Sequence, residues 1–583
     1  MRWFLKSDER GSVAVIGALS LTALIGMGAL AVELGDVYQT KVQNQRAADV
    51  AALGTAMSYV GNSSTDIQGV AASLATLNNV STNSTVTASL ITNGDGNKAV
   101  QVSVTTAVPL LLGRAVSSVT SINAGASAVA EIKPVPGNGC IVALKTGGSG
   151  VTVSGGGGFN ATNCDVISAA GVSGANCQSP PLLEAEAIYL VASSVTQPSS
   201  CGSEAPIQTT PKASNFFPNS NAPTDTIKTG ATMVNATATL GQVQAMTAPA
   251  APTPVASNTA ITVTSATATE PAQAYTSATI TTSTVNFTGG ATNTTFTGNM
   301  TFNGANTINL GAGTYIIDGN ITAGWGATTT FNTTGTVNII VGGTLGGGGS
   351  MVFGNANVTV LGGVSAGSYS LTFGTGVMQI SGGISGGGGS TISIGNSGSA
   401  ANPLTVVGGV TMGGGSTLTI GSGGAKISGT FNFTGSTLTI AAGAVYVGGD
   451  FIVGNGATTA NGVSFIIGGT GSSSTGFNNS GYMKSVTAPA TGATLGIPNV
   501  LFAAPNLQQF SIQNGGSGAN TVAGLIYLPN AAFAMSGSQQ LTSTSCLELV
   551  AATISWSGGS GGFTTCPNLG LAVSTGGTVA LVQ

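Results

Sequence analysis

An uninterrupted apolar segment near the amino terminus dominates the hydrophobic pattern of the chain. Residues 12–32 read SVAVIGALSLTALIGMGALAV and include no charged side chain over 21 positions. An α-helix rises about 1.5 Å per residue, so this stretch covers roughly the 30 Å hydrocarbon core of a bilayer. We therefore expect a transmembrane helix over residues 12–34 and a short cytoplasmic tail over residues 1–11.

Helical spacing continues beyond the apolar segment. Residues 33–60 read ELGDVYQTKVQNQRAADVAALGTAMSYV, and many of their side chains fall near one stripe of a helix. The stripe positions are Leu34, Val37, Tyr38, Lys41, Val42, Gln45, Ala48, Ala52 and Ala56. The pattern predicts one long helix that leaves the membrane without a break.

A small domain follows this helix. Residues 66–79 again show helical spacing, and two strand-like runs, STVTASLIT and AVQVSVTTAV, flank turn-forming residues at 93–97. A third strand is expected in INAGASAVAEIKPV. Residues 35–135 are thus predicted to form a pilin-like helix and a small α+β domain.

A repeat organises most of the remaining chain. Apolar runs such as VNIIVGG, VTVLGG and MQISGG end in small-residue pairs at positions 342, 362, 382, 408, 428, 448 and 468, with steps of 20, 20, 26, 20, 20 and 20. A second apolar run recurs in each period, as in SMVF and STLTI. One period cannot bury its apolar face alone, whereas stacked coils can. We expect a right-handed parallel β-helix, or β-solenoid, with first coils at 136–175 and a main body with a C-terminal cap at 284–583.

Residues 176–283 interrupt the repeat. They include the run TAPAAPTPVASNTAITVTSATATEPAQ, whose proline, alanine and threonine content is typical of a linker. We interpret this region as an insertion and linker between two parts of the solenoid. The predicted fold class is mainly β, with a long N-terminal helix, a small α+β domain and a β-solenoid.

Composition narrows the classes of function. Charged residues make up 5% of the chain, hydrophobic residues 42%, and glycine accounts for 91 positions. The high hydrophobic content is not typical of a disordered chain. Glycine does not recur at every third position, which excludes a collagen triple helix. A net charge of -4 provides no basic surface, so no nucleic-acid partner is expected.

The six cysteines all follow the apolar segment. An even number is typical of an oxidising compartment, although buried free thiols are the alternative. Fifteen pairings are possible in principle. Proximity in sequence suggests Cys140 with Cys164, Cys177 with Cys201, and Cys546 with Cys566.

The sequence offers few residues that could act in catalysis. Residues 134–583 contain five lysines, no arginine and nine acids, and the whole chain has no histidine. Glu184, Glu186, Asp318 and Asp450 are interpreted as turn or solvated carboxylates, because catalytic acids are usually grouped. No C-x-x-C, aspartate-rich repeat or phosphate loop is present, so we expect no catalytic residue, metal or cofactor. A carbohydrate-active β-helix enzyme, either a polysaccharide lyase or a hydrolase, is the alternative.

Small residues recur every fourth position in the apolar segment. Ala14, Ala18, Thr22 and Gly26 have the small-xxx-small spacing that lets two membrane helices approach closely, although Ala and Gly are also common in such spans. Glu33 lies at the outer end of the span, where its carboxylate can reach the headgroups. A contact with a partner helix is the alternative role for Glu33.

The amino-terminal region resembles a known family. RGSVAVIGALSLTALIGMGALAVELGDVYQTKVQNQRAADVAALGTA combines an Arg-Gly start, an apolar span, an acidic-Leu-Gly exit and an alanine-rich helix. This order is similar to the TadE/TadG-like proteins of the Flp (tight adherence) pilus system, over residues 8–135. The resemblance implies a structural or adhesive envelope protein whose partners are the membrane, other pilus or pseudopilin components, or a second copy. The Asp-x-Ser-x-Ser metal motif of some TadG proteins is absent from the sequence.

The charges around the span predict its orientation. Arg2, Lys6 and Arg10 precede it, so the positive-inside rule predicts a single-pass protein of the bacterial inner membrane, with its C-terminal region in the periplasm or at the cell surface. Cleavage after Ala31 would instead release a secreted adhesin for surface glycans. A pilin-type cleavage after Gly11 is disfavoured, because Ile16 would then occupy the position where pilins carry glutamate.

Overall fold

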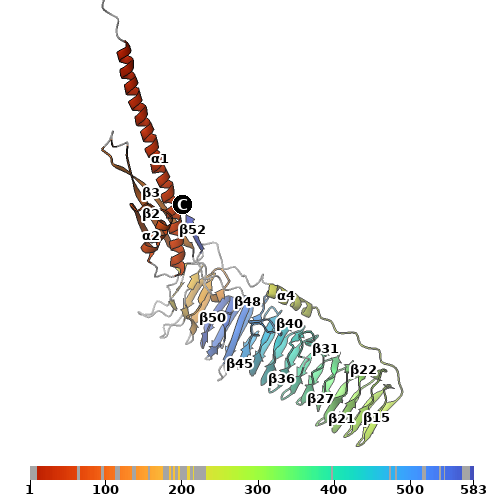
Figure 1. The fold of residues 1–583 in the computed structure, drawn as a ribbon. Helices are drawn as coiled ribbons and strands as arrows, with labels where there is room; N and C mark the ends of the chain where they lie inside the picture. Colours follow the sequence, from red (N-terminus) through yellow and green to blue (C-terminus); the bar gives the residue numbers. More distant parts are fainter. Residues whose placement is uncertain are drawn as a thin grey trace, which may run out of the picture. The chain divides into compact units, whose positions relative to one another are not determined.

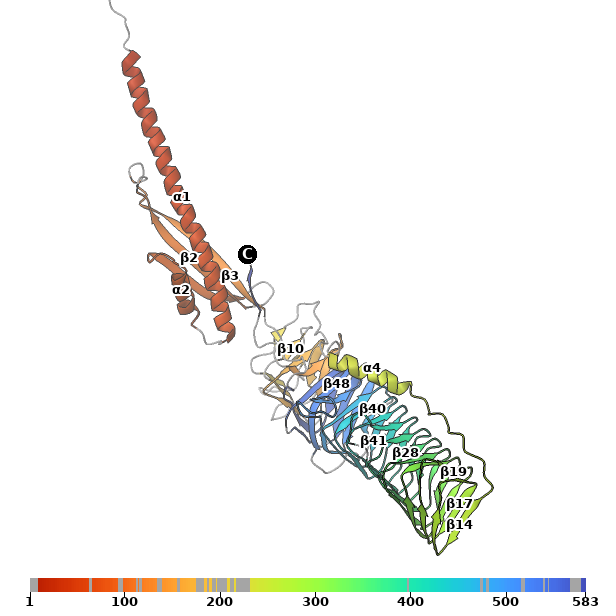
Figure 2. The same ribbon diagram turned by 45° about the vertical axis from the view of Figure 1, so that its right-hand side comes forward.

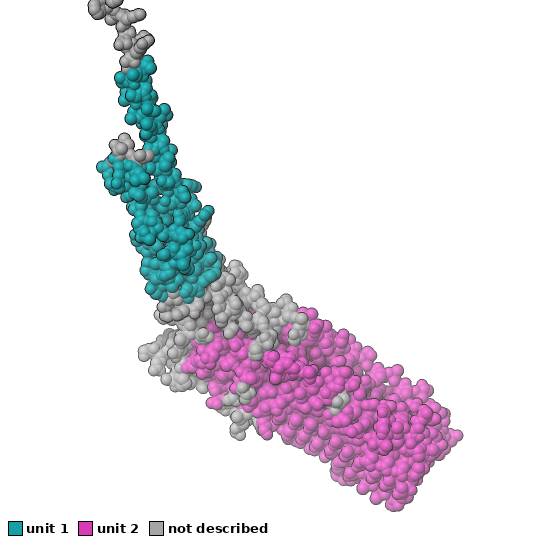
Figure 3. Space-filling model, viewed as in Figure 1, with its two compact units in different colours: residues 1–135, 574–583 teal, residues 136–573 magenta. Residues whose placement is uncertain are grey.

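The chain divides into two compact units. Unit 1 comprises residues 1–135 and 574–583, and unit 2 comprises residues 136–573 (Figure 3). The computed structural model describes residues 9–61, 66–92, 98–111, 114, 118–133, 139–154, 158–174, 183–185, 188–190, 195–196, 207–209, 214–215, 231–395, 398–471, 475–478, 482–514, 520–537, 540–543, 545–566 and 578–582.

Unit 1 is a long helix packed on a small antiparallel sheet (Figure 1). Its helices are α1 (Glu9–Gly61) and α2 (Ile67–Leu77), and the side chain of Asp66 caps α2 by accepting a hydrogen bond from the Gly69 N–H. The sheet has the order β1-β2-β3-β52. Its strands are β1 (Ser84–Thr92), β2 (Lys98–Pro109), β3 (Ser121–Lys133) and β52 (Thr578–Val582).

The alanine-rich half of α1 explains this packing. The side chains of Ala48, Ala51, Ala52 and Ala56 are fully buried and share one hydrophobic cluster with residues of α2, β2 and β3. Small side chains let the helix approach the sheet closely, and the i, i+3, i+4 spacing keeps them on one face.

The last strand of the chain belongs to unit 1. β52 pairs antiparallel with β3, and Val579 faces Ile132 across the pair. The sequence predicts a β-helix and cap up to residue 583, but residues 578–582 instead extend the first sheet. Since an unpaired edge strand exposes backbone groups, β3 gains a partner from the far end of the chain.

Unit 2 is a β-solenoid of about 16 turns, which confirms the predicted mainly β fold (Figure 2). Each coil contributes three short strands, and each strand pairs in parallel with its counterpart in the next coil. The first coil in the stack consists of β14 (Ala260–Thr264), β15 (Thr267–Glu270) and β16 (Ala274–Tyr275). We call the faces that begin with these strands the first, second and third face.

The strands of each face follow one another along the stack. The first face continues with β17 (Ser277–Thr281), β20 (Met300–Asn303), β23 (Ile321–Ala323), β26 (Leu345–Gly347), β29 (Val364–Ala366), β32 (Ile384–Gly386), β35 (Val410–Met412), β38 (Phe431–Phe433), β41 (Phe451–Gly454), β44 (Gly476–Asn478) and β47 (Gln509–Asn514). The second face continues with β18 (Thr284–Phe287), β21 (Ala305–Leu310), β24 (Thr328–Thr333), β27 (Ser350–Phe353), β30 (Ser370–Phe373), β33 (Thr391–Ile394), β36 (Thr417–Ile420), β39 (Thr437–Ile440), β42 (Ala457–Asn461) and β45 (Tyr482–Thr487). The third face continues with β19 (Thr294–Phe296), β22 (Gly313–Ile317), β25 (Val337–Val341), β28 (Asn357–Val360), β31 (Met378–Ile380), β34 (Leu404–Val406), β37 (Ala425–Ile427), β40 (Gly443–Val447), β43 (Val463–Ile467) and β46 (Val500–Ala503).

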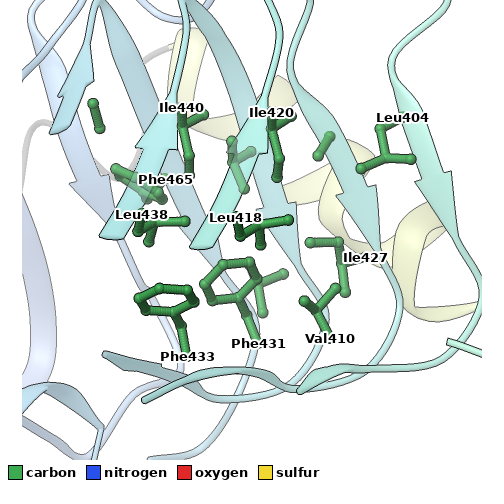
Figure 4. Close-up of a cluster of buried hydrophobic side chains, with 14 of the residues drawn as sticks. Leu404, Val410, Leu418, Ile420, Ile427, Phe431, Phe433, Leu438, Ile440 and Phe465 are labelled. Atoms are coloured by element: carbon green, nitrogen blue, oxygen red, sulfur yellow. The ribbon is translucent and has the colours of Figure 1, made fainter. Parts of the chain in front are cut away.

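Identical positions of successive coils stack into the core. Leu418 pairs with Leu438 and Ile420 with Ile440, and all four side chains point into the solenoid (Figure 4). Their alternation with outward Thr residues is the period-2 pattern of a strand that is buried on one side. The 20-residue repeat therefore arises because each coil must place an apolar side chain at the same level of the core.

Glycine at one corner allows the coils to approach closely. A Cβ atom at Gly362 would lie 2.5 Å from the carbonyl carbon of Gly343, and one at Gly382 would lie 2.5 Å from that of Gly362. The Gly362 N–H also donates a 3.0 Å hydrogen bond to the Gly343 carbonyl. The small-residue pairs of the sequence mark this corner, between the third and first faces.

The order of coils in the stack differs from their order in the chain. Two long strands, β48 (Asn520–Gly537) and β50 (Leu547–Ser557), turn corners and cover two or more faces each. β50 then pairs in parallel with β4 (Gly139–Ala143) and β5 (Ser149–Ser154), while β51 (Ser560–Gly562) pairs with β6 (Gly158–Ala161). The coils that come first in the chain are therefore stacked beyond the coils that come last.

Further strands extend this end of the stack. They are β7 (Asp165–Ser168), β8 (Gly171–Gly174), β9 (Leu183–Ala185), β10 (Ile188–Leu190), β11 (Val195–Thr196), β12 (Ile207–Thr209) and β13 (Ser214–Asn215), and β49 (Gln540–Thr542) lies between β48 and β51. Several of these strands fall within residues 176–283, which the sequence pattern assigns to an insertion. The main stack likewise begins at Ala260, before the predicted start at residue 284.

The chain returns along the outside of the solenoid to reach its far end. Helix α4 (Ala231–Gln244) and the following segment 245–259 run along the stack toward β14 (Figure 2). Met233, Ala236 and Leu240 of α4 pack on outward apolar side chains of the third face, such as Ile466. The Gln244 side-chain amide donates to the Gly448 carbonyl at 2.9 Å and fastens the end of the helix to the glycine corner.

Candidate functional site

The amino-terminal half of α1 is apolar and uncovered. Val13–Tyr59 contains a stretch that is long and apolar enough to cross a membrane, and no part of that stretch is buried. Leu19 and Leu24 expose about two-thirds of their side-chain surface, at 66% and 65%. An exposed apolar helix of this length requires a nonpolar environment or a partner helix.

The four predicted helix-packing residues lie within this exposed stretch. Ala14, Ala18, Thr22 and Gly26 are all exposed, and a Cβ atom at Gly26 would meet no atom within 4 Å. The Thr22 hydroxyl donates to the Ala18 carbonyl inside the helix. This side of the helix is therefore open to a close helix contact, and its hydroxyl already has an acceptor.

Glu33 differs from its neighbours on α1. Its side chain is 8% exposed, whereas those of Val32 and Leu34 are 64% and 50% exposed. The headgroup contact expected for this carboxylate stays a prediction, and its low exposure shows that other atoms of the protein cover the side chain. Glu33 therefore marks the level at which α1 passes from the uncovered stretch into the packed one.

A polar group at the helix–sheet contact fixes the position of α1. The Asn44 side-chain amide donates to the Ala124 carbonyl at 2.8 Å, and its oxygen accepts from the Thr106 hydroxyl at 3.0 Å. Thr106 also contacts the Ser84 hydroxyl at 2.6 Å. Buried polar groups are costly without partners, so these hydrogen bonds of Asn44 favour the observed placement of α1 on the sheet. Sequence reasoning missed this residue, although it lies four residues, or about one helical turn, before the stripe position Ala48.

Two disulfides lie where the ends of the solenoid sequence meet. The bridges Cys140–Cys164 and Cys546–Cys566 are both present, as proximity in sequence suggested. The predicted partners Cys177 and Cys201 lie outside the described residues. Because β4 pairs with β50, the two bridges belong to adjacent coils.

Glu548 is a buried carboxyl group that sequence reasoning missed. Its side chain is 1% exposed, and burial raises its pKa to about 8, although the hydrogen bond from the Cys566 N–H opposes this shift. That bond to Oε1 measures 2.6 Å, while Oε2 has no hydrogen-bond partner within the described structure. The alternation of LELV in β50 gave the only sequence signal, since Glu548 occupies an outward position between Leu547 and Leu549.

Three of the four carboxylates that the sequence offers as catalytic candidates lie in the described part of the chain, and the structure does not bring these three together. Glu184 lies on β9, Asp318 follows β22, and Asp450 precedes β41, so each belongs to a different coil. Asp450 accepts a 3.0 Å hydrogen bond from the Gly471 N–H at a corner. Glu186 lies outside the described residues, and the described part of the chain holds no group of three or more possible metal ligands.

Outward hydroxyl and amide side chains form ranks on the second face. Thr372, Ser393, Thr419 and Thr439 occupy the same position of successive coils. Asn286, Asn309 and Asn332 form a ladder in which each side-chain amide donates to the preceding one, at 2.6 and 2.9 Å. This arrangement gives these coils of the second face a regular outer surface of hydroxyl and amide groups.

The family comparison falls on α1. Residues 11–58 match the family model described as "Putative Flp pilus-assembly TadE/G-like", which confirms the expected resemblance for this part of the predicted range 8–135. No curated protein and no solved structure matches the chain. The matched range includes both the uncovered apolar stretch and the alanine-rich stretch that packs on the sheet.

Proposed function

We propose, from the TadE/G-like domain at residues 11–58, that this chain is a membrane-anchored, exported component of a Flp (tight adherence) pilus system with a structural or adhesive role. The observation that carries the proposal is the division of α1. One half is apolar and exposed, and the other half holds a folded domain through buried alanines. A helix of this kind joins a membrane to an exported domain.

The charges and the disulfides support export. Arg2, Lys6 and Arg10 precede the span and favour a cytoplasmic amino terminus. The bridges Cys140–Cys164 and Cys546–Cys566 are typical of proteins that fold in an oxidising compartment. A single-pass inner-membrane protein with its solenoid in the periplasm or at the cell surface accounts for both features.

The surface of the solenoid is better suited to a structural role than to a catalytic one. Its outward ranks consist mainly of Thr, Ser and Asn, and the described candidate carboxylates lie in separate coils. General acid–base catalysis needs ionisable groups held together at one site. We therefore propose that the solenoid acts as a shaft that displays a surface, and that the exposed helix contacts other pilus components or a second copy.

Fractionation with protease shaving tests this proposal. The full-length chain is expected in the inner-membrane fraction, and protease added to spheroplasts should degrade the solenoid while an amino-terminal tag stays protected. Recovery in the cytosol would contradict export. A mature chain that begins after Gly11 or Ala31 would replace anchoring with processing.

A further inference from the structure

One aromatic side chain breaks the pattern of the solenoid surface. Trp325, between β23 and β24, is 87% exposed, whereas Trp556 is fully buried. Within the described solenoid coils from residue 260 onward, the other large hydrophobic side chain that is markedly exposed is Val352, at 38%. Exposing an indole ring costs hydrophobic free energy, so this position requires an explanation other than folding.

Trp325 forms a pair with an aromatic residue two coils away. Its ring lies 5.5 Å from the ring of Tyr369, between β29 and β30, at an interplanar angle of 84°. Adjacent strands are separated by about 4.8 Å, so a pair across two coils must bridge an intervening corner. The edge-to-face geometry is a favourable one for aromatic rings.

The intervening corner consists of glycine. Gly348 and Gly349 lie between β26 and β27, and a Cβ atom at Gly348 would lie 3.3 Å from the Trp325 Cα. The Gly326 N–H donates to the Gly348 carbonyl at 3.1 Å, which keeps the two backbones in contact. The tetraglycine run 346–349 thus leaves the corner free of side chains, and the two rings occupy that space.

Hydroxyl side chains border the aromatic pair on both sides. Thr322 and Ser365 occupy outward positions of the first face, both in register with Gly346. Thr328 and Ser370 stand at the start of their strands on the second face, and the Ser370 N–H donates to the hydroxyl of Ser350 between them. All of these side chains are at least partly exposed, so their hydroxyls can donate and accept bonds at the surface.

The surroundings carry almost no charge. Asp318 and Lys426 are the only charged residues in the sequence from 271 to 449. Asp318 follows β22 at a corner of the third face, and Lys426 lies on β37 of the same face. The aromatic pair lies at the corner between the first and second faces, where the sequence places no charged residue, so a charged ligand would find no counter-charge at this corner.

We propose that Trp325 and Tyr369 form a binding platform for a neutral saccharide. The C–H face of a pyranose ring is apolar and stacks on an exposed indole, while its equatorial hydroxyls point outward to the rim of Thr and Ser. An uncharged aromatic platform with hydroxyls on both sides matches this division of a sugar into apolar faces and a polar edge. This inference names a class of ligand for the adhesive role in the proposed function. It rests on the proposed function only for the location, in the periplasm or at the cell surface, in which the chain would meet that ligand.

Tryptophan fluorescence of the purified full-length chain in detergent tests the platform. The probes are neutral linear glucan hexasaccharides with α-1,4, β-1,4 and β-1,3 linkages, and an oligogalacturonate serves as the acidic counterpart. The chain has three tryptophans, of which Trp325 is the exposed one in the described solenoid. The variants are Trp325→Ala and Tyr369→Ala, and Val255→Ala removes an exposed apolar side chain from segment 245–259 as a matched control.

We expect at least one neutral hexasaccharide to change the emission at millimolar concentration. Trp325→Ala should weaken binding at least about tenfold, as measured by competition or calorimetry, and Val255→Ala should leave it unchanged. Absence of a response to all neutral probes, or equal binding by Trp325→Ala, would overturn the proposal. The proposal would also be overturned if self-association of the chain alone shielded Trp325, because the aromatic pair would then be a protein–protein contact. Since binding is measured on purified protein, a failure here is distinct from a failure of the localisation test.

Discussion

Ile141 of β4 and Leu549 of β50 are register partners in one parallel sheet, although they come from opposite ends of the solenoid sequence. This pairing continues the hydrogen-bonded ladder from the last coils of the chain into the first ones. Contacts between residues so distant in sequence form only after the long chain between them is closed, which carries an entropic cost. The two disulfides in the adjacent coils lie at this junction.

Removal of the bridge Cys140–Cys164 should loosen this junction. The bridge spans a sequence separation of 24 residues, for which the chain-entropy account gives a stabilisation of about 3 kcal/mol. We expect the double variant Cys140→Ala/Cys164→Ala to show faster hydrogen exchange in β4 and β50 than the unmodified protein. Exchange in β36 and β39, in the middle of the stack, serves as the internal control. Unchanged exchange at the junction would show that strand pairing alone holds it.

Glu548→Gln should make the solenoid less sensitive to alkaline pH. Burial raises the pKa of Glu548 from 4.5 to about 8. Between these two pH values, the carboxyl group therefore keeps its proton in the folded protein and loses it in the unfolded chain. The free energy of unfolding of the unmodified protein therefore falls as pH rises from about 4.5 to about 8, by on the order of a few kcal/mol. The glutamine variant keeps the shape and the Cys566 bond but has no charge to bury.

The difference between the two proteins is measured by thermal unfolding at pH 5 and pH 8. We expect Glu548→Gln to be the more stable at pH 8, with the advantage gone at pH 5. Glu184→Gln is the matched control, because Glu184 lies partly exposed on β9 and its replacement removes the same charge. A parallel decline of both variants with pH would rule out Glu548 as the group responsible.

Alanine at Gly362 should disrupt the stack, while alanine at Gly414 should not. A Cβ atom at Gly362 would collide with the Gly343 backbone at 2.5 Å, whereas one at Gly414 would meet no atom within 4 Å. We expect a cost of about 1–3 kcal/mol at Gly362 and a change within about 0.5 kcal/mol at Gly414. Denaturant unfolding of both variants measures this difference. Equal stabilities of the two variants would show that the corner glycines reflect the high glycine content of the chain and are not required by the close approach of the coils.

The sequence predicted the periodic part of the fold because each coil repeats the same physical requirement. Leu418 and Leu438 recur at a fixed interval since each must fill one level of the core. The docking of β52 on β3 and of β4 on β50 has no such local signal, because a short strand can pair with any free edge in register. Sequence reasoning also missed Trp325, because a single aromatic residue at a corner leaves no periodic pattern.

The uncovered side of α1 gives the last prediction. Gly26 and Gly17 both lie in the apolar stretch, and a Cβ atom added at either position would meet no atom within 4 Å. At 3.6 residues per turn they face opposite sides of the helix, so Gly17 is a matched control for Gly26. If Ala14, Ala18, Thr22 and Gly26 form a close helix contact, Gly26→Leu should reduce association of the span in membranes several-fold, and Gly17→Leu should leave it near the original level. Energy transfer between labelled spans in lipid vesicles measures this association. Equal effects at both positions would show that the small residues reflect the composition of the span and that partners are recognised elsewhere, through the small sheet or the solenoid.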